Sequence, residues 1–251
     1  MGTMPLVMSR VLRMMRSLLR LRHRRAWGPF VETAESTGFD HAFTANWSQG
    51  GEDLALLSVF AGNDGGTYLD IGAHHPSRFS VTRHLYQRGW TGVNVEANQK
   101  LLNKFHEDRV KDTNLFCAVG EKDYYDFVVF KEPALSTYNQ QWETKFVSEG
   151  NEIDRIDRIP GRKLRSIYDE YFGAAAVDLL NIDAEGGDFE ILQSMDFLTL
   201  PRARFPKYIQ VESAPPMVVS LNIPSVKFLI GFEYECFLIL PYTTILKRID
   251  F

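Results

Sequence analysis

Residues 68–76 read YLDIGAHHP, and residues 92–98 read GVNVEAN. Each segment is an apolar run that leads into an acid, Asp70 in the first and Glu96 in the second. Gly72 and Ala73 predict a small-residue turn at which a ligand can approach the backbone closely, and an acid that ends the next strand can bind two ribose hydroxyls. The two segments therefore predict a pocket for a nucleoside cofactor.

The glycine pattern distinguishes between two classes of cofactor. A dinucleotide site uses three spaced glycines to admit a pyrophosphate at a helix N-terminus, and only Gly72 of such a set is present. Asp70-x-Gly72 instead suits a ligand that has an amino-acid end and no phosphate there, which is S-adenosylmethionine. An NAD-dependent oxidoreductase is the less favoured interpretation.

Strand and helix signals alternate along the chain, which is typical of a doubly wound parallel sheet. We expect strands at 67–71, 92–96, 114–119, 177–183 and 208–212, and helices at 50–60, 80–88, 99–107, 163–172 and 188–195. Segments 234–240 and 243–249 are joined only by Pro241 and Tyr242, too short for a parallel crossover, so they predict an antiparallel hairpin. The fold class is α/β: five parallel strands and a terminal hairpin, the Rossmann-like sheet of class I methyltransferases.

Residues 132–160 interrupt this alternation. Strand signals at 125–130 and 152–158 flank a polar, aromatic segment, 136–150, which could cover the substrate or could be a hairpin and helix without that role. Its aromatic residues could stack equally well on a sugar or on a flat aglycone; they are Phe130, Tyr138, Trp142 and Phe146.

Length and composition indicate one globular α/β domain of 251 residues, with 45% apolar and 24% charged residues. No apolar run reaches the roughly 18 residues of a membrane span. Cys117 and Cys236 lie in apolar segments, so we expect reduced cysteines in a cytoplasmic protein. The sequence has no nucleic-acid-binding motif. It leaves open whether the protein forms a homo-oligomer.

The first 25 residues carry seven arginines and no acid, so the remaining 21 basic residues face 32 acidic ones. Apolar residues recur between the arginines with helical spacing, which predicts a basic amphipathic helix. Such a helix could lie on an anionic membrane and hold the protein peripherally at its inner face. Equally, the segment could be disordered or a misassigned N-terminus, since Met4 and Met8 are also possible starts. We therefore divide the chain into an arm and linker, 1–45, and a catalytic domain, 46–251.

Four acids lie at the carboxyl ends of four predicted strands: Asp70, Glu96, Asp183 and Glu212. This edge of the sheet is where such folds bind ligands. We expect Glu96 at the ribose and Asp70 near the methionine amino group or stabilising the loop. Asp183 is best placed to face the transferred methyl group.

A sugar hydroxyl as acceptor would need help to lose its proton, because ionising it beforehand costs on the order of 7 kcal/mol. His74 and His75 follow the cofactor loop and could accept this proton. Asp183, Glu185 and Glu212 could do so instead, or could hold a Mg²⁺ that acidifies the hydroxyl.

These motifs together resemble the FkbM-type S-adenosylmethionine-dependent methyltransferases. The resemblance covers about residues 46–250 and rests on segments 68–76, 78–80 (RFS), 88–96 (RGWTGVNVE) and 178–186 (DLLNIDAEG), with 48–53 (SQGGED) before the first strand. Ala184 and Gly187 depart from residues that family members often carry. The resemblance implies O-methylation, commonly of a sugar hydroxyl in a glycolipid, polysaccharide or glycosylated natural product.

By this resemblance the cofactor site includes Asp70, Gly72, Ala73, Glu96 and Asn98, with Glu52 at its methionine end. We also expect cofactor contacts from His74, Ser80, Ala97, Ala118 and Asp183. Two alternatives stay open: an O-methyltransferase acting on a non-sugar lipid or polyketide hydroxyl, and a catalytically silent, membrane-associated binding protein on the same fold.

Overall fold

The computed structural model describes residues 46–213 and 221–250. The basic helix predicted in residues 1–25, and the arm and linker as a whole, lie outside the described residues. None of the described helices combines the length and the apolar character needed to cross a membrane.

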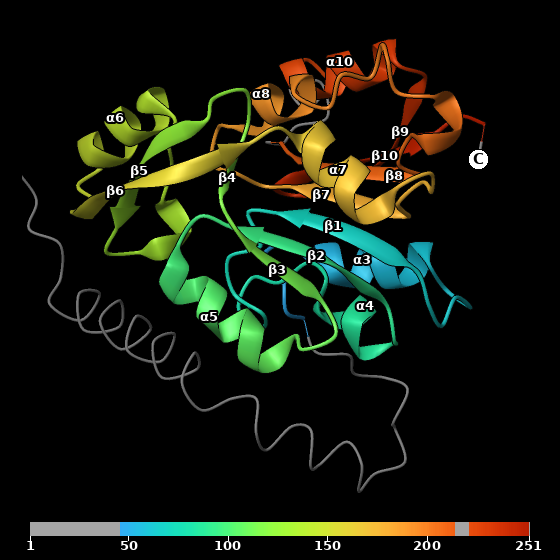
Figure 1. The fold of residues 1–251 in the computed structure, drawn as a ribbon, viewed down its shortest axis with the longest axis horizontal. Helices are drawn as coiled ribbons and strands as arrows, with labels where there is room; N and C mark the ends of the chain where they lie inside the picture. Colours follow the sequence, from blue (N-terminus) through green and yellow to red (C-terminus); the bar gives the residue numbers. More distant parts are fainter. Residues whose placement is uncertain (1–45, 214–220, 251) are drawn as a thin grey trace, which may run out of the picture. The chain divides into compact units, whose positions relative to one another are not determined.

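A seven-stranded sheet forms the centre of the described domain, in the order β3-β2-β1-β7-β8-β10-β9 (Figure 1). Neighbours among the first five strands are parallel, whereas β10 is antiparallel to both β8 and β9. The predicted fold class, with its terminal hairpin, is confirmed. The strands are β1 (Thr67–Ile71), β2 (Thr91–Glu96), β3 (Thr113–Phe116), β7 (Leu179–Ile182), β8 (Tyr208–Glu212), β9 (Tyr234–Ile239) and β10 (Thr243–Arg248).

Helices cover both faces of this sheet because alternate strand residues point to opposite sides. Leu69 and Ile71 of β1 pack in a cluster with α7 (Leu164–Phe172), α8 (Asp188–Gln193) and α10 (Pro224–Gly231). Tyr68 packs on the other face with α3 (Glu52–Val59) and α4 (Arg83–Gln87). Each fully buried aliphatic side chain contributes about 1.5–3 kcal/mol, so the two clusters fix the strand register.

A second, three-stranded sheet stands beside the first, in the order β4-β6-β5 (Figure 1). Its strands are β4 (Ala118–Val119), β5 (Tyr124–Phe130) and β6 (Ile153–Arg162), and between β5 and β6 lie the short 3-10 helix η1 (Pro133–Leu135) and α6 (Gln140–Ser148). The insertion predicted at 132–160 is thus part of a small subdomain.

The predicted strand 114–119 is two strands. Phe116 is the last β3 residue paired with β2, opposite Glu96, and Ala118 pairs with Gly161 of β6 in the second sheet. Cys117 stands at the change of partner and lines the pocket described below. The chain leaves one sheet for the other here because β6 supplies new pairing partners that local sequence does not reveal.

Two further differences concern helices. The helix predicted at 80–88 begins only at Arg83, because Phe79 has a φ of 58° and the Ser80 amide donates to the Trp47 carbonyl, which is not helical geometry. Helix α10 was not predicted, although Pro224 stands at its first turn, where proline is favoured. The remaining helices are α5 (Gln99–Asp108) and the 3-10 turn η2 (Arg202–Arg204).

Candidate active site

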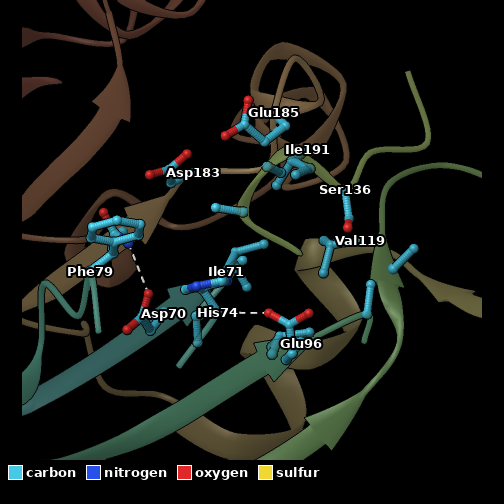
Figure 2. Close-up of a pocket in the computed structure, with 18 of the residues that line it drawn as sticks. Asp70, Ile71, His74, Phe79, Glu96, Val119, Ser136, Asp183, Glu185 and Ile191 are labelled. Atoms are coloured by element: carbon cyan, nitrogen blue, oxygen red, sulfur yellow. Dashed lines mark hydrogen bonds between the residues drawn. The ribbon is translucent and has the colours of Figure 1, made fainter. Parts of the chain in front are cut away.

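A pocket lies beyond the carboxyl ends of β1, β2 and β7, and its volume of about 880 Å³ includes open solvent at its mouth (Figure 2). Figure 2 shows Asp70, His74 and Glu96 on one side of this space and Asp183 and Glu185 on the other. Nine of the predicted site residues line it: Asp70, Gly72, Ala73, His74, Glu96, Ala97, Ala118, Asp183 and Glu185. The structure therefore brings these nine predicted residues together at one pocket.

Five predicted residues do not line the pocket, and they have other contacts. Ser80 accepts a hydrogen bond from the buried Arg109, and the Asn98 side chain caps α5 by accepting the Lys100 amide. The other three are Glu52, His75 and Glu212. Glu52 accepts the Gly50 amide, and its charge acts on Asp183.

Asp70 is buried at the base of the pocket. Its two carboxylate oxygens accept hydrogen bonds from Thr82 Oγ1 and Asn181 Nδ2, both at 2.8 Å. Burial raises the pKa of Asp70, and these two donors act in the opposite direction. Because each carboxylate oxygen has a further lone pair, Asp70 can still accept a hydrogen bond from a ligand.

Glu96 is held by two backbone amides. Its Oε2 accepts the His74 N–H at 2.8 Å, and its Oε1 accepts the Asn98 N–H at 2.7 Å. Burial raises the pKa of Glu96 to about 7 despite these hydrogen bonds. The amides fix the orientation of the carboxylate, and its two oxygens are acceptors of the kind that suits a pair of vicinal hydroxyls.

Gly72 forms the turn at the end of β1. Its φ is 77°, and a Cβ atom there would lie 1.8 Å from the Asp183 carbonyl oxygen. The amides of Gly72 and Ala73 both donate to the Val95 carbonyl. The turn therefore lets β1 and β7 approach closely, so that Asp70 and Asp183 share one pocket.

The two histidines differ in position. His74 lines the pocket with a φ of 56°, and burial together with the charge of Arg78 lowers its pKa to about 4. His75 Nδ1 accepts the amides of Ser77 and Arg78 at 3.0 and 3.1 Å, so that nitrogen stabilises the loop. Such a low pKa makes His74 a poor proton acceptor at neutral pH.

Asp183 stands among other acids. Its side chain is exposed to the pocket, yet the protein around the carboxylate and the charges of Glu212, Asp70 and Glu52 raise its pKa to about 7. Burial and the charges of Asp183, Glu212 and Asp188 raise the pKa of Glu185 to about 9. The buried Asp188 accepts the amides of Ala184 and Glu212, and these hydrogen bonds connect the ends of β7 and β8.

The predicted magnesium site finds no support. Among the described residues there is no group of three or more His, Cys, Asp or Glu side chains arranged to hold a metal ion. Asp183 and Glu185 line the pocket, but Glu212 does not.

The insertion packs on the loop that follows β7. Thr137 Oγ1 donates to the Glu185 carbonyl and Asn139 Nδ2 to the Gly186 carbonyl, both at 2.8 Å. A Cβ atom on Gly186 would lie 2.0 Å from the Trp142 ring. Insertion residues also line the pocket, namely Pro133, Ala134, Ser136 and Tyr138. Phe130 and Phe146, in contrast, are buried in the insertion's own core and cannot stack on a ligand.

Sequence reasoning missed several lining residues because distant segments bring them to the pocket. They include Gln49, Phe79, Val95, Val119, Asn181 and Ile191. Asn181 had a usable signal, since it lies two positions before Asp183 on the predicted strand and so faces the same side of the sheet. Phe79 had none, because its φ of 58° orients it through an irregular turn.

The sequence model of the methyltransferase FkbM domain matches residues 70–223, more than half of the chain. The chain belongs to the FkbM methyltransferase family. The match includes the acid-bearing ends of β1, β2, β7 and β8, and therefore the pocket of this FkbM domain. No curated protein matches the chain.

Three solved structures similar to this FkbM protein are methyltransferases by description. Methyltransferase FkbM from Methylobacillus flagellatus KT has 13% identity and a TM-score of 0.46, over 79% of this chain and 48% of its own. A TehB-like SAM-dependent methyltransferase from Corynebacterium glutamicum has 8% identity and a TM-score of 0.40, over 88% of this chain and 96% of its own. A putative RNA methyltransferase from Pyrococcus horikoshii has 12% identity and a TM-score of 0.41, over 79% of this chain and 84% of its own.

This chain spans about half the length of the Methylobacillus protein. Because all three TM-scores lie below 0.5, the family assignment rests on the FkbM domain model. Methyltransferases of this family use S-adenosylmethionine, and the FkbM pocket has hydrogen-bond acceptors that suit it. Asp70 and Glu96 are acids that suit an amino group and ribose hydroxyls, and Val95, Ala118 and Val119 form an apolar wall that suits an adenine.

Proposed function

We propose that this FkbM methyltransferase transfers the methyl group to a hydroxyl, that of a sugar in a glycolipid, polysaccharide or glycosylated natural product. The observation that carries this proposal is Asp183. It lies at the tip of β7 beside the cofactor turn, is open to the pocket, and has a pKa of about 7. A base with this pKa is matched to proton removal near neutral pH.

The residues that would hold the cofactor are Glu96 for the ribose and Asp70 for the amino end. When bound, the cofactor supplies an electrophilic methyl group on its sulfonium. The protein's contribution is then orientation: the amides of His74 and Asn98 fix Glu96, and Thr82 and Asn181 fix Asp70. Fixed carboxylates hold a ligand without the entropy cost of ordering them at each turnover.

Asp183 would accept the hydroxyl proton while the acceptor oxygen bonds to the methyl carbon; the bond from that carbon to the sulfonium sulfur would break at the same time, and its electron pair would stay on the sulfur of the departing S-adenosylhomocysteine. General-base catalysis of this kind avoids prior ionisation of the hydroxyl, which costs on the order of 7 kcal/mol. Within residues 46–213 and 221–250 no side chain or amide donates a hydrogen bond to the Asp183 carboxylate. With respect to these described residues, its lone pairs are unused.

The insertion would bind the acceptor. Ser136 and Tyr138 line the pocket, and the half-buried Trp142 packs on the loop that carries Glu185. Hydroxyl groups beside aromatic rings suit a sugar, whose ring has polar edges and apolar faces.

The test is transfer of a labelled methyl group from S-adenosylmethionine to matched acceptors that carry a sugar hydroxyl, a non-sugar lipid hydroxyl or an amine. We expect a methyl ether on the sugar acceptor, and loss of transfer in Asp183→Asn. Asp126→Asn, which removes an exposed acid on β5, serves as the control. Methylation of the amine or of the non-sugar lipid alone would contradict the proposal.

A further inference from the structure

Arg78 joins three groups at the rim of the pocket. Its Nη1 and Nη2 donate to the two carboxylate oxygens of Glu132 at 3.0 and 3.1 Å, and its guanidinium lies 4.2 Å from the centre of the Phe79 ring. Nη1 is also 3.3 Å from Nε2 of His74. The bidentate ion pair and the ring together hold the guanidinium in one orientation.

These contacts connect two walls of the pocket that are far apart in sequence. His74 and Phe79 line the pocket from the loop after β1, and both have positive φ, 56° and 58°. Glu132 caps η1 by accepting the Ala134 amide, and Pro133 and Ala134 of η1 line the opposite wall. Arg78 thus stabilises a strained loop by attaching it to the insertion.

The contact between Arg78 and His74 also bears on which ring nitrogen of His74 carries the proton. A guanidinium has hydrogen-bond donors and no acceptor, so His74 Nε2 must accept and must carry a lone pair. The ring is then neutral, with its proton on Nδ1. Burial and the charges of Arg78, His75 and Lys104 favour the neutral ring, whereas the charge of Glu132 acts in the opposite direction; the sum lowers the pKa of His74 to about 4.

We propose that Arg78 is a positioning residue that holds His74 as the neutral Nδ1–H tautomer and attaches its loop to the insertion. His74 then offers the ligand in the pocket a hydrogen-bond donor and not a base. This inference deepens the proposed function, on which it rests, since it leaves proton removal to Asp183. It adds a requirement for the two pocket walls to stay joined while the cofactor is bound.

The first readout is the His74 tautomer in the protein without cofactor. Nitrogen-15 NMR of histidine-labelled protein separates the two ring nitrogens, and a His74→Gln variant identifies the signal. We expect the Nδ1–H form from pH 5.5 to 8 in the wild type, and a mixture of tautomers with a higher pKa in Arg78→Met. Lys131→Met breaks the exposed Lys131–Glu152 ion pair next to Glu132, and should leave the His74 signal unchanged.

The second readout is calorimetric binding of S-adenosylhomocysteine. We expect Arg78→Met to weaken it about three-fold to five-fold, since an exposed ion pair contributes modestly, and Lys131→Met to leave it unchanged. An Nε2–H tautomer in the wild type, or an unchanged His74 signal in Arg78→Met, would overturn the inference about Arg78. If the wild-type protein does not bind S-adenosylhomocysteine, the proposed function is contradicted, whereas the result on the His74 tautomer is unaffected.

Discussion

Glu96 and Asp183 follow strands of the same sheet, yet their surroundings differ. Both oxygens of Glu96 accept backbone amides, whereas Asp183 faces the pocket among other acids. Both carboxyl groups have a pKa raised to about 7, so the difference lies in their contacts: the Glu96 oxygens are fixed by donors, which suits binding, whereas the Asp183 carboxylate faces the pocket, which suits proton transfer. Single substitutions should therefore separate binding from turnover.

Glu96→Gln keeps the size of the side chain but replaces one acceptor oxygen by a donor, which then faces the His74 or the Asn98 amide. The amide offers the ribose hydroxyls one acceptor oxygen fewer, and a hydrogen bond to a charged group contributes about 1.5–3 kcal/mol, so we expect binding of S-adenosylhomocysteine to weaken at least about ten-fold. Calorimetry measures this, with Asp126→Asn as the exposed control. Wild-type affinity in Glu96→Gln would remove the ribose assignment.

Asp183→Asn should reduce kcat by about 100-fold or more while S-adenosylhomocysteine binds nearly as in the wild type. The base must be deprotonated to accept a proton, so wild-type kcat should rise with pH with a midpoint near 7. Initial rates between pH 5.5 and 8.5 test both expectations. Unchanged turnover in the variant, or a flat pH profile, would assign proton removal elsewhere.

The turn after β1 is the element on which the site depends. Gly72→Ala would place a methyl group 1.8 Å from the Asp183 carbonyl oxygen at a φ of 77°, which should cost about 3–5 kcal/mol from overlap and backbone strain together. Gly62→Ala has a similar φ of 83° and open space, so it should cost only about 1–2 kcal/mol. Denaturant unfolding of both variants compares them; equal losses would mean that the close approach of β1 and β7 contributes nothing.

The sequence predicted those helices and strands that the local pattern of apolar and turn residues determines. The predicted strands 67–71 and 208–212 match β1 and β8, because a short apolar run between turn residues specifies a buried strand. The division of 114–119 between two sheets was not predictable, since it depends on pairing with β6. Within the site, the acids at strand ends were predicted, whereas Phe79 and Arg78 depend on an irregular turn and on a distant partner.

At the scale of the whole molecule, the acids in and around the pocket link stability to pH. Asp183, Asp188, Glu96 and Glu212 have pKa values raised to about 7, and Glu185 to about 9. The folded protein therefore holds protons that the unfolded chain has lost above about pH 5. Stability that these groups provide at low pH is lost as the pH rises through their folded pKa values.

We expect Tm to fall by several degrees between pH 7 and pH 9, where His74 and His75 are neutral when folded and nearly so when unfolded. Scanning calorimetry at constant ionic strength measures this slope. Asp183→Asn and Glu185→Gln should both flatten it, because neither replacement side chain titrates. A Tm that rises over this range would contradict the pKa directions.

The most direct test of the whole account is calorimetric titration of the purified protein with S-adenosylhomocysteine and, separately, with NAD, each with and without EDTA. We predict micromolar binding of S-adenosylhomocysteine that EDTA does not change, and no binding of NAD. Binding of NAD, or of neither compound, would contradict the assignment of the Asp70–Glu96 pocket to S-adenosylmethionine.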